Sequence, residues 1–239
     1  MVADRHLAPD AHAFNRNWRG VRDYVASLDA DLTVHLGDVT VDGLGDPTHF
    51  HHARSLSAEW PTPIRYVPGN HDVGDNPPGP GVVPKHPFEP ARIGAFRTAL
   101  GPDHWALDAD GRRVIALDAQ LVGTGTREEA DQWSWLAATA AGARDRPVAL
   151  VLHKPLFQDS PLDEKPVDAV RHVWLPSTAF YLPDELQERL GEKVTGLGVL
   201  DLTPDGLHFH LVCPEGVARN SVLDHPVYPE LGRARLAAR

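Results

Sequence analysis

Residues 64–72 read Ile-Arg-Tyr-Val-Pro-Gly-Asn-His-Asp, an apolar stretch that runs directly into polar, metal-binding residue types. The apolar part, 64–67, predicts a buried β-strand. In open α/β sheets, ligands bind beyond the carboxyl ends of the strands. The polar part therefore predicts a ligand site directly after this strand, with Asn70, His71 and Asp72 as its candidate residues.

Three further fragments have the same arrangement, in which polar residues follow an apolar, strand-like run. They are Asp4 and His6 after residues 1–3, Gly37 and Asp38 after residues 32–36, and His153 after residues 148–152. Each fragment alone is weak, because Gly-Asp and Gly-Asn are also common in turns. Four strand ends that present carboxylates, imidazoles and an amide to one crevice are nevertheless typical of a metal-assisted hydrolase.

Helix and strand signals alternate over the first two-thirds of the chain, and antiparallel strands follow. We expect helices at 15–28, 47–60, 91–100 and 126–141, and strands at 31–36, 64–67, 104–107, 114–117, 148–152, 170–175, 194–202 and 207–212, the last two as a hairpin. The Pro/Gly-rich segment 75–90 predicts a loop at the rim of a site. This order of elements predicts an α/β fold with mixed sheets.

Composition excludes several classes of protein. With 239 residues, 42% of them hydrophobic, the chain fits one domain with a substantial core. No apolar run could span a membrane and no signal peptide is evident, so we expect a cytoplasmic location without membrane association. A net charge of −10 argues against general nucleic-acid binding, and the single Cys213 excludes an internal disulfide and a Cys-based zinc site. The sequence leaves the oligomeric state open.

A pair of metal ions about 3.5–4 Å apart needs one ligand that touches both. Asp38 is the best candidate for this bridge, because a carboxylate has two oxygens and Gly37 lets the backbone come close to the metals. Asp4 and His6 are two residues apart, so on an extended segment they point to the same side. These two residues could therefore hold one metal together.

The amide of Asn70 and the imidazole of His153 suit the second metal. Carboxylate and imidazole ligands favour Mn, Fe or Zn over Ca or Mg. Because adjacent residues rarely both point at one metal, we expect His71 to protonate the leaving oxygen instead of binding a metal. Asp72 is then a candidate for holding the His71 imidazole in the right tautomer.

Taken in order, the fragments resemble the calcineurin-like metallophosphoesterases, whose pattern is Asp-x-His, Gly-Asp-x-x-Asp, Gly-Asn-His-Asp/Glu, a lone His and then Gly-His-x-His. Segments 14–18, 67–72, 153–157 and 174–180 are similar to a bacterial branch close to cyclic-nucleotide-phosphodiesterase-like members. The resemblance implies a four-layer α/β/β/α sandwich of two mixed β-sheets flanked by helices. It also implies that a metal-bound hydroxide hydrolyses a small phosphoester, a phosphodiester rather than a monoester, at two divalent transition-metal ions.

The same resemblance assigns roles to individual residues. Asp4, His6 and Asp38 would hold the first metal. Asp38, Asn70 and His153 would hold the second, and His71 would contact the phosphate or the leaving group. We expect residues 1–213 to form the catalytic domain and residues 214–239 to form a tail packed on its surface.

Two departures from the family pattern stand out. Val41 occupies the position of the second acid in Gly-Asp-x-x-Asp; the absence of a Tyr there argues against a purple-acid-phosphatase type. More seriously, residues 154–173 contain no Gly-His-x-His motif. A segment of about 30 residues, the length of a helix, a strand and a loop, is expected to be missing near 161–167.

His208 and His210 have His-x-His spacing, but they lie in the expected final hairpin, and we interpret them as part of a surface strand. We likewise expect His49, His51 and His52 to be solvated, or to contact the metal ligands instead of a metal ion. Three explanations of the missing motif stay open: a segment outside the printed sequence, a genuine deletion, and completion of the metal shells by a partner chain or solvent. We favour the first; the second would leave a weakened or inactive pseudoenzyme that uses the scaffold for binding.

Overall fold

The computed structural model describes residues 1–77, 83–144, 146–154, 173, 175–183, 193–203, 205–224 and 228. Its helices are α1 His12–Val25, α2 Thr48–Ser57, α3 Asn70–Val73, α4 Pro90–Leu100 and α5 Arg127–Ala141, with short 3-10 turns η1 Ala119–Leu121 and η2 Val222–Asp224. Its strands are β1 Thr33–Leu36, β2 Ile64–Val67, β3 Trp105–Ala109, β4 Arg112–Ala116, β5 Val148–Val151, β6 Leu197–Thr203 and β7 Gly206–Val212. In this part of the chain, no helix is long and apolar enough to cross a bilayer.

The four long predicted helices are present, with shifted ends. The helix expected at 15–28 spans 12–25, because the N–H groups of Ser27 and Leu28 bond to carbonyls three residues back and tighten the last turn. Thr126 accepts a hydrogen bond from the Glu129 N–H at 3.3 Å and so caps α5. The Glu129 carboxylate accepts from backbone N–H groups of the preceding loop, so only half of a capping box is formed.

Two regions differ from the sequence-based expectation or lie outside the described residues. The expected break near 161–167 lies outside the described residues. The expected strand at 170–175 also lies outside them, apart from Val173 and Leu175, which belong to no strand. The expected first strand at 1–3 is reduced to a single bridge between Val2 and His35.

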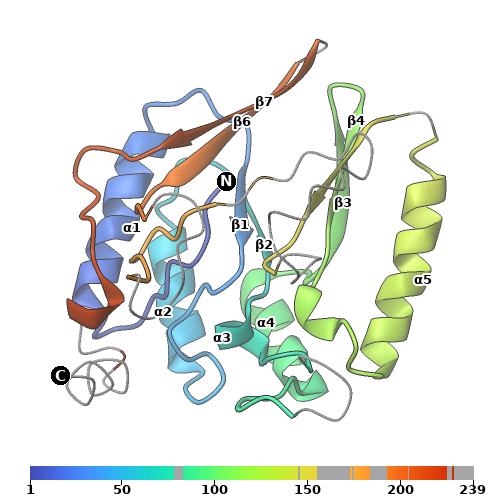
Figure 1. The fold of residues 1–239 in the computed structure, drawn as a ribbon, viewed down its shortest axis with the longest axis horizontal. Coiled ribbons are helices and arrows are strands. Elements are labelled where there is room, and N and C mark those ends of the chain that lie inside the picture. The colour runs from blue at the N-terminus through green and yellow to red at the C-terminus, as the bar shows by residue number, and fades with distance from the viewer. Residues whose placement is uncertain are drawn as a thin grey trace.

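The first sheet is built around the start of the chain. β1 and β2 pair in parallel, with Thr33 opposite Ile64. On the other side of β1, Val2 donates to the Val34 carbonyl, and Met1 exchanges backbone hydrogen bonds with Gly198 of β6. Residues 1–3 therefore lie between β1 and the antiparallel β6–β7 hairpin, as Figure 1 shows around the N-terminus.

The second sheet has the order β3–β4–β5, with β3–β4 antiparallel and β4–β5 parallel. Its apolar face packs on the first sheet, where Val34 and Val67 contact Trp105, Val114, Ala116 and Val151. Helices α1, α2 and α4 share a second core with β2, and α5 lies on the far side of β3–β5 (Figure 1). The α/β class is confirmed, and the complete four-layer sandwich stays an expectation, because the described strands form only small sheets.

The largest aromatic contact of the core joins α1 to the segment between α2 and β2. The rings of Trp18 and Trp60 stack with centroids 3.8 Å apart and planes 16° apart. The Trp60 indole N–H also donates to the Thr33 hydroxyl at 2.8 Å, which ties this stack to the start of β1. Trp60 thus connects the helical layer to the strand that carries Asp38 at its end.

We predict that Trp60→Ala lowers the free energy of unfolding by about 3–5 kcal/mol, because it leaves a cavity beside Trp18 and removes the hydrogen bond from the indole to the Thr33 hydroxyl. Urea unfolding followed by circular dichroism measures this change. The matched control is Trp133→Ala on α5. Trp133 is 41% exposed, so its removal should lower the free energy of unfolding by about 1 kcal/mol or less. Equal losses for both variants would contradict this assignment of the core.

Candidate metal centre

The first two predicted fragments run side by side. The Asp4 N–H donates to the Gly37 carbonyl at 3.0 Å, and the His6 N–H donates to the Asp38 carbonyl at 3.1 Å. This pairing continues the contact between the chain start and β1 past the end of the strand. The backbone therefore fixes the position of Asp4 and His6 relative to Asp38.

The same three residues have a strained backbone. Asp4, His6 and Asp38 have φ values of +48°, +45° and +51°. This left-handed conformation is rare for residues other than glycine and costs about 1–3 kcal/mol at each position. Of the five described non-glycine residues with positive φ, these three are all predicted metal ligands. Strain concentrated in this way is typical of a functional site.

Two glycines allow the strand ends to approach each other. At Gly37, where φ is +88°, an added Cβ would lie 2.6 Å from Nδ1 of His153 and 2.9 Å from the Cα of Gly69. At Gly69, an added Cβ would collide with the carboxylate and the backbone N of Asp38. A side chain at either position would push Asp38 and His153 apart, so the absence of a Cβ is a requirement of the site.

Asp72 holds two of the loops together. Its carboxylate is fully buried and accepts hydrogen bonds at 3.0 Å from the N–H groups of Val39, Thr40 and Gly69, and at 2.9 Å from the Thr40 hydroxyl. This differs from the expectation that Asp72 orients His71. These bonds tie Asp72 to the loop after β1 and to Gly69, and none of them involves the His71 ring.

Backbone carbonyls orient two of the imidazoles instead. Nδ1 of His71 lies 2.7 Å from the Val41 carbonyl, and Nδ1 of His153 lies 2.7 Å from the Leu36 carbonyl. A carbonyl oxygen can only accept, so each Nδ1 carries a proton, and in the neutral form of the ring Nε2 presents a lone pair. Metal-binding histidines commonly have this arrangement, with the distal N–H fixed by a carbonyl.

Asp38 lies at the centre of the cluster. Its Oδ2 is 3.7 Å from Nε2 of His6 and 4.0 Å from Nε2 of His71, and its Oδ1 is 3.5 Å from Nε2 of His153. Nδ1 of His153 is also 3.9 Å from Oδ1 of Asp4. The ligand atoms fall into two groups that could each hold an ion, His6–Asp38–His71 and Asp4–Asp38–His153, and Asp38 belongs to both.

This grouping differs in part from the family correspondence, which places Asp4 with His6 and leaves His71 out of the ligands. In the structure, Asp4 faces His153, and His71 lies in the group of His6. The position of Asp38 between the two groups is the one that its expected bridging role requires. The roles of the individual residues therefore stay predictions, although the residues themselves come together.

Asn70 joins the group around His153. Its amide oxygen lies 3.2 Å from Nε2 of His153. The next residue, His71, uses its backbone N–H to donate to Oδ1 of Asp38 at 2.9 Å. With a proton on Nδ1, neutral His153 turns a lone pair toward the amide oxygen, and two acceptors this close repel each other unless a proton or a cation lies between them. The donor set of this group thus fits a metal ion.

Burial and mutual attraction set the charges of the cluster. Burial raises the pKa of Asp4 to about 7, although the imidazole of His153 opposes this shift. Burial also acts to raise the pKa of Asp38, but the imidazoles of His153, His71 and His6 outweigh it and hold that pKa at about 2. Burial, followed by His71, lowers the pKa of His6 to about 3. At neutral pH, Asp38 is therefore ionised and His6 is neutral, which are the forms that bind a cation. Asp4 loses its proton, and becomes able to bind a cation, as the pH rises through neutrality.

The other histidines lie elsewhere in the fold. His208 and His210 are exposed on β7 and belong to neither ligand group, which agrees with their interpretation as a surface strand. His49 on α2 accepts a hydrogen bond from the Asp42 N–H at 3.1 Å and so helps to hold the loop that follows Asp38. Sequence reasoning missed Tyr228, whose hydroxyl lies 2.6 Å from Nδ1 of His6, because the loosely patterned tail gives no local signal for such a contact.

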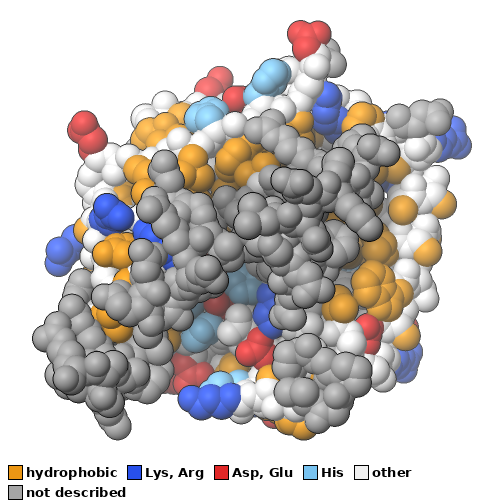
Figure 2. Space-filling view, in the orientation of Figure 1, with side chains coloured by type: hydrophobic (Ala, Val, Ile, Leu, Met, Phe, Trp, Pro, Cys, Tyr) orange, Lys and Arg blue, Asp and Glu red, His pale blue; other side chains and the backbone are white. Residues whose placement is uncertain are grey.

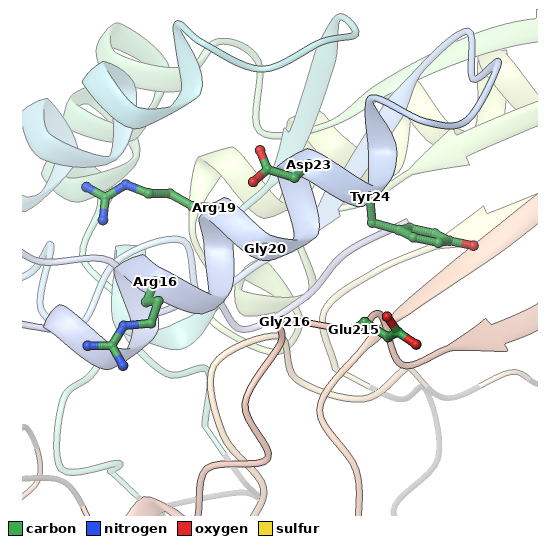
Figure 3. Close-up of a pocket in the computed structure, with 7 residues that line it drawn as sticks. All are labelled: Arg16, Arg19, Gly20, Asp23, Tyr24, Glu215 and Gly216. Atoms are coloured by element: carbon green, nitrogen blue, oxygen red, sulfur yellow. The ribbon is translucent and has the colours of Figure 1, made fainter.

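Polar side chains gather on one face of the molecule. In Figure 2, histidine, acidic and basic side chains lie close together near the centre of the view, in the region where Figure 1 places α3. A separate surface pocket of about 620 Å³ lies between α1 and residues 215–216 (Figure 3). There, Arg16 and Arg19 point away from Tyr24 and Glu215, so the polar groups do not converge on one ligand.

A family model described as calcineurin-like phosphoesterase matches residues 2–176. The chain belongs to this family. The match covers every predicted metal ligand, and family membership suggests metal-dependent hydrolysis of a phosphoester. The chain matches no curated protein.

Two solved structures are similar to parts of this chain. One is a purple acid phosphatase, PPD1, from seeds of yellow lupin (Lupinus luteus), with 14% identity and a TM-score of 0.39 over 59% of this chain and 26% of that one. The other is AQ665 from Aquifex aeolicus, a protein of unknown function, with 11% identity and a TM-score of 0.31 over 64% of this chain and 87% of that one. This chain thus spans about a quarter of the lupin enzyme.

We predict that Gly37→Ala removes most of the affinity for divalent metal ions, because the new methyl group would displace His153. Calorimetric titration of the metal-free protein with Mn²⁺ measures this loss. Gly111→Ala is the matched control, since Gly111 also has positive φ, at +73°, but an added Cβ there meets nothing within 4 Å. The control should lose about 1–2 kcal/mol of stability and keep its metal affinity. Unchanged metal binding by Gly37→Ala would contradict the close approach of the two strand ends.

Proposed function

We propose that this chain hydrolyses a phosphodiester with two divalent transition-metal ions, Mn, Fe or Zn. The observation that carries the proposal is the position of Asp38, which belongs to two separate groups of potential ligands. A pair of metals needs such a shared carboxylate. The strained backbone at Asp4, His6 and Asp38 supports the same conclusion.

The ligands are assigned by combining geometry with family correspondence. Asp4, His6, Asp38, Asn70 and His153 would hold the ions, with Asp38 between them. Bound divalent ions would polarise the phosphoryl oxygens and lower the pKa of a water molecule at the site. The protein supplies fixed ligands and oriented imidazoles, so that little reorganisation is needed when the substrate arrives.

His71 is proposed to donate a proton to the leaving oxygen. Its side chain is 33% exposed, whereas the side chains of His6 and His153 are 4% and 10% exposed. A partly exposed imidazole such as that of His71 can contact a substrate, whereas a buried imidazole can contact only groups inside the site, such as a metal ion. The Val41 carbonyl fixes the orientation of His71 through Nδ1, so the proton that His71 donates is carried by Nε2 of the imidazolium form. Burial acts to lower the pKa of His71, but the neighbouring carboxylates and carbonyl, Asp38 foremost, together outweigh it and raise that pKa, which favours the imidazolium.

The charges around the site favour a diester over a monoester. A phosphodiester has one negative charge, and a monoester approaches two near neutral pH. The nearest lysine in the sequence, Lys154, directly follows His153, and its ammonium group bonds to Asp75 and to Asn76. Part of its positive charge is thereby neutralised, in a chain with a net charge of −10.

We predict that the Mn²⁺-loaded protein hydrolyses bis(p-nitrophenyl) phosphate with a higher kcat/KM than p-nitrophenyl phosphate. Asp38→Ala should reduce the rate at least about 10³-fold, because charge stabilisation at both metals is lost together. The matched control is Asp42→Ala, an exposed acid in the same loop, which should stay near the wild-type rate. Full activity in Asp38→Ala would refute the mechanism. An absence of bound metal and of hydrolysis in the wild-type protein would favour the pseudoenzyme that the missing Gly-His-x-His motif suggests.

We predict that His71→Ala lowers kcat by about 10²–10⁴-fold, because the leaving oxygen loses its proton donor. The same variant should keep both metal ions, as elemental analysis of the dialysed protein would report. His51→Ala, an exposed histidine on α2, is the control and should change neither quantity. Loss of a metal ion from His71→Ala would show that His71 is a ligand and not the proton donor.

A further inference from the structure

We propose that Tyr228, in the C-terminal segment, is a positioning residue that prepares His6 to bind a metal ion. This inference rests on the proposed function, because it concerns one of the two metals. The juxtaposition behind it is direct: the Tyr228 hydroxyl lies 2.6 Å from Nδ1 of His6, across 222 positions of the chain.

The two side chains meet in a dry environment. Tyr228 is 9% exposed and His6 is 3% exposed. The rings of Phe14 and Phe180 lie 6.5 and 4.9 Å from the His6 ring, between centroids, and neither can form a conventional hydrogen bond with it. The Tyr228 ring is also 5.8 Å from that of His71, so it borders the whole His6–Asp38–His71 group.

The need for this hydroxyl follows from the orientation of His6. Nε2 of His6 faces Asp38 and must present a lone pair to a metal ion. The ring proton of the neutral imidazole then lies on Nδ1, and a buried N–H without an acceptor is costly. The Tyr228 oxygen is that acceptor, so the phenol fixes both the tautomer and the ring orientation of His6.

The arrangement differs from that of the other two imidazoles. Backbone carbonyls hold His71 and His153, and no substitution of a side chain removes these acceptors. The acceptor for His6 is a side chain, so a single substitution can remove it. One metal position should therefore depend on Tyr228, and the other should not.

The path of the C-terminal segment supports a specific contact. Asn17 of α1 bonds to both backbone groups of Ala218, at 2.8 and 2.9 Å. The backbone of Tyr181 then pairs with residues 220 and 222. These buried and partly buried contacts fix the segment shortly before Tyr228. The residues expected to form a surface tail thus supply part of the environment of the metal centre.

The test is calorimetric titration of the metal-free, full-length protein with Mn²⁺, comparing wild type with Tyr228→Phe. We expect two equivalents in the wild type. In Tyr228→Phe, one equivalent should bind about 10- to 100-fold more weakly while the other keeps its affinity. The matched control is Tyr181→Phe, which removes a hydroxyl from a neighbouring tyrosine and should leave both equivalents unchanged. Circular dichroism of the same samples reports whether each variant is folded.

Wild-type affinity for both equivalents in Tyr228→Phe would overturn the inference and leave the proposed function intact. Equal weakening of both equivalents would also overturn it, because this points to a general loosening of the fold. If the wild-type protein binds no Mn²⁺ at all, the metal centre itself is refuted, and this inference falls with it.

Discussion

The geometry of the candidate metal centre depends on the buried carboxylate of Asp72. It accepts hydrogen bonds from the loop that follows β1, at Val39 and Thr40, and from Gly69 in the loop that follows β2. Burial, followed by repulsion from Asp38, raises the pKa of Asp72, so only a full set of donors makes the ionised group tolerable here. Because this carboxylate joins the two loops, Asp38 and Asn70 cannot move apart independently. The strands bring the loops to one edge of the sheet, and Asp72 fixes the distance between them.

The positions of the ligands follow from this connection. With the loops held together, Gly37 and Gly69 are pressed against His153 and Asp38, where no Cβ would fit. The backbones of Asp4 and His6 then pair with the same loop and adopt positive φ. A rigid scaffold thus holds ligands whose local backbone is unfavourable, which is how binding sites are preorganised.

Much of this arrangement could be predicted from the sequence, because each ligand directly follows an apolar run that determines its own strand. Local patterns could not show which carboxylate pairs with which imidazole, since that depends on the spacing of the loops in space. The sequence predicts that Asp72 orients the His71 imidazole, because the two residues are adjacent. In the structure, the Asp72 carboxylate instead bonds to Val39 and Thr40, more than 30 positions away. Tyr228 was missed for the same reason, since its partner His6 lies at the other end of the chain.

The absent Gly-His-x-His motif makes the number of bound metals the central question. We propose that the remaining predicted ligands, arranged about Asp38, still bind a pair. Anomalous diffraction from a crystal of the Mn²⁺-loaded protein tests this most directly. We expect two anomalous peaks about 3.5–4 Å apart, one on each side of the Asp38 carboxylate. A single peak, or two peaks that Asp38 does not join, would contradict it.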